Sequence, residues 1–176
     1  MGASGSGSAP SAHAVRIGHG WDLHRLAPGH ALTIGGVSIP HDRGCVAHSD
    51  GDVLLHTVTD ALLGALSLPD IGQLYPDTDP RWKGASSDRF LLDAAERVRA
   101  AGYRIGNLDA TIIAQRPKLS PHKETIRRNV CALLDIPLGD FNLKAKTHEN
   151  VDSLGENRSI AAEAVVLLFK EEGKGA

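Results

Sequence analysis

The sequence predicts an α+β fold, a single mixed β-sheet with three helices on one face plus a short β-hairpin. Strand-like runs open and close the chain, and three segments with helical hydrophobic periodicity lie between them. With 176 residues, 41% of them hydrophobic and 23% charged, the chain is long enough to bury its own core. We predict one domain over residues 15–172, followed by a tail at 173–176. The opening "MGASGSGSAPSAHA", residues 1–14, is typical of a disordered tail or a processing remnant.

The first elements predicted are strands. The runs "VRIGHGWDL" and "ALTIGGVSI" have strand composition, "APGH" between them predicts a turn, and the glycine pair in the second run predicts a tight reversal. After "HSDGD" the period changes to that of a helix, which begins near Val53 and ends before Pro69. Ser49 and Asp50 are the candidate caps of this helix.

The second half continues with alternating helices and strands. The segment "DRFLLDAAERVRAAG" predicts a helix ended by Gly102, and "NLDATIIAQ" predicts a strand. In "SPHKETIRRNVCALLDI" we expect a third helix with Ser120 as its cap and Pro121 in its first turn. The last two strands are predicted in "FNLKAKT" and "SIAAEAVVLLFK".

Composition excludes several classes of partner. A net charge of -2 and a pI near 6.5 provide no general attraction to nucleic acid. No apolar run approaches the roughly 20 residues needed to span a bilayer. We therefore predict neither a nucleic-acid partner nor a membrane partner. Cys45 and Cys131 lack the paired spacing of a zinc ribbon or redox motif, which favours a reducing compartment.

A metal site is predicted from one aspartate and two histidines. Asp22 and His24 are two apart in a predicted strand, so their side chains share a face. Imidazole nitrogen and carboxylate oxygen are zinc ligands, and His56 on the first helix is the candidate third ligand. Asp52 or Asp60, one helical turn to either side, could accept the second imidazole N–H. The alternative is a metal-free hydrogen-bonded pair on the strand and an ordinary helix histidine.

A second polar stretch, "KAKTHENVDSLGENRS", lies near the end of the chain. Strand alternation would place Lys144, Lys146 and His148 on one face, with Thr147 and Glu149 opposite. Such a set suits a phosphate pocket in which Glu149 holds a hard cation. An edge strand kept soluble by its lysines is the alternative. The acidic loop around residues 70–79 and the "HSDGD" segment are likewise open to interpretation as ordinary turns.

Several long motifs occur together and in order. They resemble the 2-C-methyl-D-erythritol 2,4-cyclodiphosphate synthase family of the non-mevalonate isoprenoid pathway, over nearly the whole chain after residue 15: "RIGHGWDLHRL", "AHSDGDVLLHTVTDALLGAL", "PDIGQLYPDTDPRWKGASS", "GYRIGNLDATIIAQRPKLSPH" and "NLKAKTHENVDSLGENRSIAAEAV". The resemblance implies a phosphorus–oxygen lyase that is a homotrimer with its sites between subunits. It implies a small-molecule cytidine diphosphate substrate, and a compartment that is the bacterial cytoplasm or the plastid stroma.

The same resemblance implies roles for individual residues. Asp22, His24 and His56 would bind one Zn²⁺ per subunit, and Glu149 would bind a second divalent ion, Mg²⁺ or Mn²⁺. The residues implied to be catalytic are His48, Thr147 and Glu149. Those implied to bind substrate are Ser49, Asp70, Gly72, Tyr75, Asp77, Ala114, Pro117, Lys118 and Leu119.

One departure and two rival functions accompany this interpretation. Many bacterial relatives carry a glycine- and arginine-rich segment where this chain has "DSLGENRS", so Arg158 takes no role from the resemblance. Two histidines and one aspartate also suit a non-haem iron oxygenase. A metal-stabilised nucleotide-binding module without turnover is the non-catalytic alternative.

Overall fold

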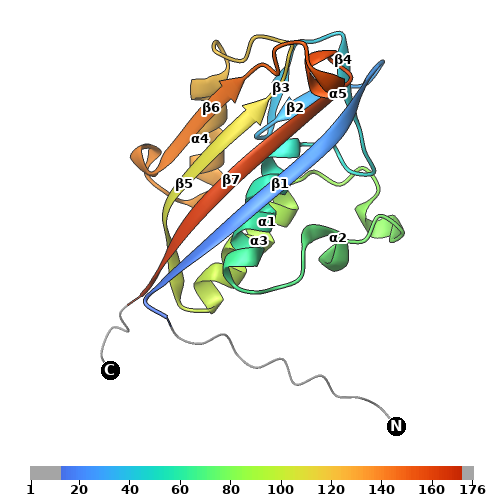
Figure 1. The fold of residues 1–176 in the computed structure, drawn as a ribbon. Coiled ribbons are helices and arrows are strands. Elements are labelled where there is room, and N and C mark those ends of the chain that lie inside the picture. The colour runs from blue at the N-terminus through green and yellow to red at the C-terminus, as the bar shows by residue number, and fades with distance from the viewer. Residues whose placement is uncertain (1–12, 172–176) are drawn as a thin grey trace.

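A mixed five-stranded sheet forms the centre of the computed structural model, which describes residues 13–171 (Figure 1). The predicted tail at 173–176 and nearly all of the predicted tail at 1–14 lie outside the described residues. The strand order is β4-β1-β7-β5-β6, in which only β5 and β6 are parallel neighbours. The bounds are β1 Val15–Pro28, β4 Arg43–Val46, β5 Tyr103–Ile113, β6 Phe141–Lys146 and β7 Ser159–Lys170.

The remaining strands confirm the predicted hairpin. β2 (Leu32–Ile34) and β3 (Val37–Ile39) pair antiparallel, with Gly35 and Gly36 in the reversal between them. Both glycines have positive φ, +60° and +73°, a conformation that side chains other than glycine rarely adopt. β4 was not predicted from the sequence, because four residues are too few to show an alternating pattern.

Three long helices cover one face of the sheet, as predicted (Figure 1). They are α1 (Val53–Ala65), α3 (Asp88–Ala100) and α4 (Lys123–Leu134). Two single-turn helices, α2 (Ile71–Leu74) and α5 (Asp152–Gly155), were not predicted, since one turn carries no hydrophobic period. Two 3-10 turns, Pro80–Trp82 and Leu138–Asp140, complete the elements. Among the described residues, no helix is long and apolar enough to cross a membrane.

Close approach of α1 to β1 positions the candidate site. A Cβ added to Gly18 would lie 1.8 Å from the carbonyl oxygen of Ala61, and one added to Gly20 would lie 2.0 Å from that of Thr57. Only glycine fits at these two strand positions. Since Gly18 and Gly20 lie on the helix-facing side of β1, Asp22, two residues further along, faces α1 as well.

Two predicted helix caps are wrong, although α1 begins at Val53 as predicted. Asp52, not Ser49 or Asp50, is the N-cap of α1, and its carboxylate accepts hydrogen bonds from the backbone N–H groups of Leu54 and Leu55. The same carboxylate accepts from Gly35 N at 2.9 Å and Gly36 N at 2.6 Å, so it also ties the β2–β3 turn to the helix. Sequence spacing alone could not choose among neighbouring polar residues, because the choice depends on this tertiary contact.

The start of α4 is the second correction. The helix begins at Lys123 with His122 as N-cap and no side-chain capping bond, so Ser120 does not cap it and Pro121 precedes its first turn. The predicted end of α3 is confirmed. Gly102 has φ +73° and donates its N–H to the carbonyl oxygen of Arg99.

Candidate functional site

Asp22, His24 and His56 converge in the structure and form a possible metal-binding triad. Asp22 Oδ2 lies 3.0 Å from His24 Nε2 and 3.2 Å from His56 Nδ1, and the two ring nitrogens are 3.1 Å apart. β1 supplies the first two side chains and α1 supplies the third. The side chains are 27%, 15% and 11% exposed, so the triad is partly open to solvent.

The triangle fits a tetrahedral metal ion. Zinc bonds of about 2.0–2.1 Å place tetrahedral ligand atoms about 3.3–3.4 Å apart, a few tenths of an ångström more than the three distances here. A proton on one ring nitrogen can be donated to only one of the other two atoms. A cation at the centre would bind all three, and three protein ligands would leave a fourth position open.

Electrostatics favour an ionised carboxylate in the triad. Burial works to raise the pKa of Asp22, but the hydrogen bonds and charges of His24 and His56 outweigh it. The pKa of Asp22 is therefore held below its usual range. An ionised carboxylate is the form that binds a metal ion.

The second nitrogen of His56 meets two serine hydroxyls, not the carboxylates we predicted. His56 Nε2 lies 2.8 Å from Ser87 Oγ and 3.2 Å from Ser49 Oγ. Asp52 is engaged at the α1 N-cap, and Asp60 accepts a hydrogen bond from Ile71 N. The prediction that Asp52 or Asp60 holds the ring is wrong, because both carboxylates cap backbone N–H groups instead.

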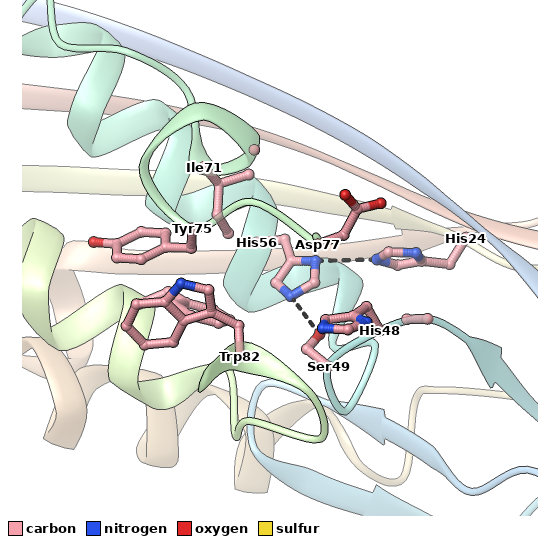
Figure 2. Close-up of a pocket in the computed structure, with 11 residues that line it drawn as sticks. His24, His48, Ser49, His56, Ile71, Tyr75, Asp77 and Trp82 are labelled. Atoms are coloured by element: carbon pink, nitrogen blue, oxygen red, sulfur yellow. Dashed lines mark hydrogen bonds between the residues drawn. The ribbon is translucent and has the colours of Figure 1, made fainter. Parts of the chain in front are cut away.

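A cavity of about 370 Å³ adjoins the triad and contains His24 and His56 in its wall (Figure 2). Five residues that the resemblance implicates also line it, namely His48, Ser49, Gly72, Tyr75 and Asp77. Figure 2 shows His56 between His24 and Ser49, with the Tyr75 and Trp82 rings on the far side of the pocket from His24. Asp70 is absent from the wall. It caps α2, and its carboxylate accepts from the backbone and side-chain nitrogens of Gln73.

An aromatic cluster that the sequence did not reveal forms one wall of this cavity. The Tyr75 ring centroid lies 5.3 Å from that of Trp82 and 4.7 Å from that of Phe90. The Tyr75 hydroxyl donates to the Asp93 carboxylate, which also pairs with Arg97 at 2.7 Å. Burial and this hydrogen bond raise the pKa of Tyr75, so the phenol is neutral at physiological pH. The cluster anchors the loop before α3, which carries Asp77.

The predicted nucleoside-binding residues line a different pocket. A cavity of about 450 Å³ is formed by the segment after β5 and the end of β6. Its wall contains Thr147 and the four implicated residues of "AQRPKL", namely Ala114, Pro117, Lys118 and Leu119. It shares no lining residue with the cavity beside the triad. One described chain therefore holds the two halves of the predicted site in separate pockets.

Glu149 lies outside both cavity walls, on the loop after β6. β6 ends at Lys146, so residues 147–149 are not part of a strand and the alternation assumed for them does not apply. Thr147 Oγ1 donates to Glu149 Oε1 at 2.8 Å, which places side chains predicted to share a face in contact. Lys144, however, does lie on the strand, where it pairs with Asp109.

Comparison with known proteins identifies the family. A family model described as the YgbB family matches residues 15–169. The chain belongs to the YgbB family. Among its relatives, the chloroplastic 2-C-methyl-D-erythritol 2,4-cyclodiphosphate synthase of Catharanthus roseus is 68% identical over 156 residues, which cover 89% of this chain and 66% of that protein. The synthase of Burkholderia mallei is 54% identical, with 89% and 96% covered.

Similarity to a solved structure agrees with the sequence match. IspF of Plasmodium falciparum, solved as a CDP complex, superimposes with a TM-score of 0.80 at 36% identity, covering 90% of this chain and 97% of that one. The resemblance predicted from the motifs is confirmed. The chain spans about two thirds of the length of its Catharanthus relative, and its relatives include both chloroplast and bacterial proteins.

Proposed function

We propose that this chain converts 4-diphosphocytidyl-2-C-methyl-D-erythritol 2-phosphate to 2-C-methyl-D-erythritol 2,4-cyclodiphosphate and CMP, as a phosphorus–oxygen lyase. The Asp22–His24–His56 triad at the wall of a cavity is the observation that carries the proposal. Membership of the YgbB family, with relatives named as synthases of this cyclodiphosphate, supports the choice of product. The greater identity with the chloroplast relative supports a plastid location.

The reaction needs alignment and charge neutralisation more than a nucleophilic side chain. An oxygen of the 2-phosphate forms a bond to the β-phosphorus, the bond from that phosphorus to the CMP oxygen breaks, and CMP leaves with the electron pair. Holding both ends of one substrate together can remove about 7–11 kcal/mol of barrier. Both reacting groups are anionic, so cationic and hydrogen-bonding groups must surround them.

Two metal sites fit this requirement. Asp22, His24 and His56 would hold one Zn²⁺ per subunit, and Glu149 would hold Mg²⁺ or Mn²⁺. Bound there, these ions would neutralise charge on the phosphate oxygens. His48 and Thr147 would hydrogen-bond the phosphates. Thr147 contacts Glu149 already, so one short loop would present both a hydroxyl and a carboxylate to the diphosphate.

The remaining residues would position the organic parts of the substrate. Ser49, Tyr75 and Asp77 line the cavity beside the triad, which suits the erythritol portion. Asp70 and Gly72, at the start of α2, would bind the ribose; the Asp70 oxygens each keep a lone pair beyond the bonds to Gln73. The pocket of about 450 Å³ would hold the cytosine between the residues Ala114, Pro117, Lys118 and Leu119.

A homotrimer would unite the two pockets. In one chain they share no lining residue, so we propose that the nucleoside pocket of one subunit meets the triad cavity of its neighbour. The sheet face opposite the helices supports such an assembly. It exposes Ile17 (68%), Trp21 (52%), Val165 (45%) and Leu23 (39%), apolar surface of the kind that subunit contacts bury.

Phosphorus NMR of the purified protein with substrate and Mg²⁺, before and after chelation, tests the proposal. We expect signals of CMP and a cyclic diphosphate that disappear when the metals are removed. Unchanged substrate with metal-loaded, folded protein would overturn the proposal. Binding of CDP under those conditions would identify a binding module, and iron in place of zinc in the purified protein would favour an oxygenase.

A further inference from the structure

We propose that Ser87, oriented by Asp50, is a positioning residue that fixes the tautomer and orientation of His56. The inference rests on the proposed function, since it assigns His56 Nδ1 to the metal ion. Nδ1 is the nitrogen that faces Asp22 and His24, whereas Nε2 faces away from them toward Ser87. A neutral imidazole that presents a lone pair at Nδ1 must carry its hydrogen at Nε2.

The direction of each hydrogen bond follows from Asp50. Its carboxylate accepts from two backbone groups, Ser87 N at 3.0 Å and Asp52 N at 3.2 Å. The Ser87 hydroxyl donates to the same carboxylate, so its hydrogen is already engaged. The lone pairs of Ser87 Oγ are then left for His56 Nε2, 2.8 Å away, which must donate. The order of donation is therefore His56 to Ser87 to Asp50.

The position of Ser87 provides independent support. Ser87 is the N-cap of α3, where a serine hydroxyl ordinarily accepts a hydrogen bond from a backbone N–H of the first turn. No such bond is made here, because the hydroxyl binds Asp50 and His56 instead. The side chain is completely buried, at 0% exposure. A buried N-cap serine that makes no capping hydrogen bond leaves the start of its helix less stable. This cost indicates that the Ser87 hydroxyl is held for its contact with His56.

Ser49 is the other hydroxyl near His56, and it suits this task less well. Its Oγ lies 3.2 Å from His56 Nε2, further than that of Ser87, and also accepts from Gly51 N. Ser49 lines the cavity, so in the proposed function its hydroxyl turns to substrate. Ser87 does not line the cavity, so substrate bound there would not compete with His56 for its hydroxyl.

The test compares Ser87→Ala with Ser86→Ala, an identical change at the exposed neighbouring serine. In metal-free protein, where His24 Nε2 lies 3.0 Å from Asp22 Oδ2 and can donate the hydrogen that this carboxylate accepts, ¹⁵N NMR of the histidine rings reports which nitrogen of His56 carries the hydrogen. Competition with a chelator reports zinc affinity. We expect His56 to lose its uniform Nε2–H form in Ser87→Ala and zinc affinity to fall about 10- to 100-fold, with no change in Ser86→Ala.

Further variants separate positioning from a general structural effect. Ser87→Thr keeps a hydroxyl and is expected to restore the Nε2–H form, whereas Asp50→Ala is expected to reproduce the Ser87→Ala spectrum. Wild-type zinc affinity in folded Ser87→Ala, with or without a tautomer change, would overturn the proposal. If the wild-type protein binds no zinc, the proposed function fails. Separately, an unchanged His56 tautomer in metal-free Ser87→Ala would overturn the proposal that Ser87 fixes this tautomer.

Discussion

The triad region and the loop after β6 contrast in how completely one chain builds them. His56 and Ser87 are buried, and each is held by partners from another element. Thr147 and Glu149 are exposed and bind each other two residues apart. The side chains of the first region are therefore held by contacts from several elements, whereas those of Thr147 and Glu149 are exposed and held by a contact between near neighbours.

Loss of a triad ligand should have the largest effect. We expect His56→Ala to lose bound zinc and to lower kcat/KM by about 10³-fold or more, because metal-assisted charge stabilisation is worth several kcal/mol. Metal analysis and circular dichroism would show zinc lost from a folded protein. His30→Ala, at an exposed histidine in the turn before β2, is the matched control. Undiminished zinc in His56→Ala would exclude His56 as a ligand.

The second largest expected effect is on the free energy of unfolding, through the cap of the helix that carries His56. Asp52→Ala removes the cap of α1 and leaves the backbone N–H groups of Gly35 and Gly36 without their acceptor. We expect the free energy of unfolding to fall by about 2–4 kcal/mol, measured by urea denaturation. Asp70→Ala, at the exposed cap of α2, should cost about 0.5–1 kcal/mol. Equal losses in the two variants would contradict the contrast between buried and exposed caps.

Glu149→Gln tests the loop after β6. We expect kcat to fall about 10- to 100-fold at low Mg²⁺ and to recover partly at high Mg²⁺, because the second ion loses its carboxylate while zinc stays bound. Glu156→Gln, which breaks only an exposed pair with Arg158, is the control. A loss of zinc in Glu149→Gln would show that the two regions are not independent.

Sequence patterns predicted the part of the site that regular elements determine. Strand alternation placed Asp22 and His24 on one face, and helical periodicity placed His56 on an element that packs there. The identity of the partner of His56 was beyond such reasoning. Ser87 is 31 residues away and reaches the ring only because α3 packs against α1. Its one local signal was a pair of serines before a helix, which indicates a cap.

The conformation of the loop after β6 was not predicted, for a different reason. Its predicted faces assumed that the strand continued past Lys146, but Glu149 and Asn150 adopt left-handed backbone conformations with φ of +50° and +62°. Neither residue is a glycine, so composition did not reveal the turn. The nucleoside-binding role that we propose for the residues "AQRPKL" comes only from the resemblance, because these residues show no periodicity of their own.

The smallest expected effect is the pH dependence of the metal-free protein. The folded-state pKa of Asp22 lies below its usual range, so the ionised carboxylate contributes stability above about pH 4 and loses it as the pH falls. Denaturation of metal-free wild type and Asp22→Asn should therefore show an advantage for wild type at pH 7 that shrinks below pH 4. Asp152→Asn, in the exposed loop where His148 pairs with Asp152, should change the profile less and only at low salt. A wild-type advantage that grew toward low pH would mean that burial, not the two imidazoles, dominates at Asp22.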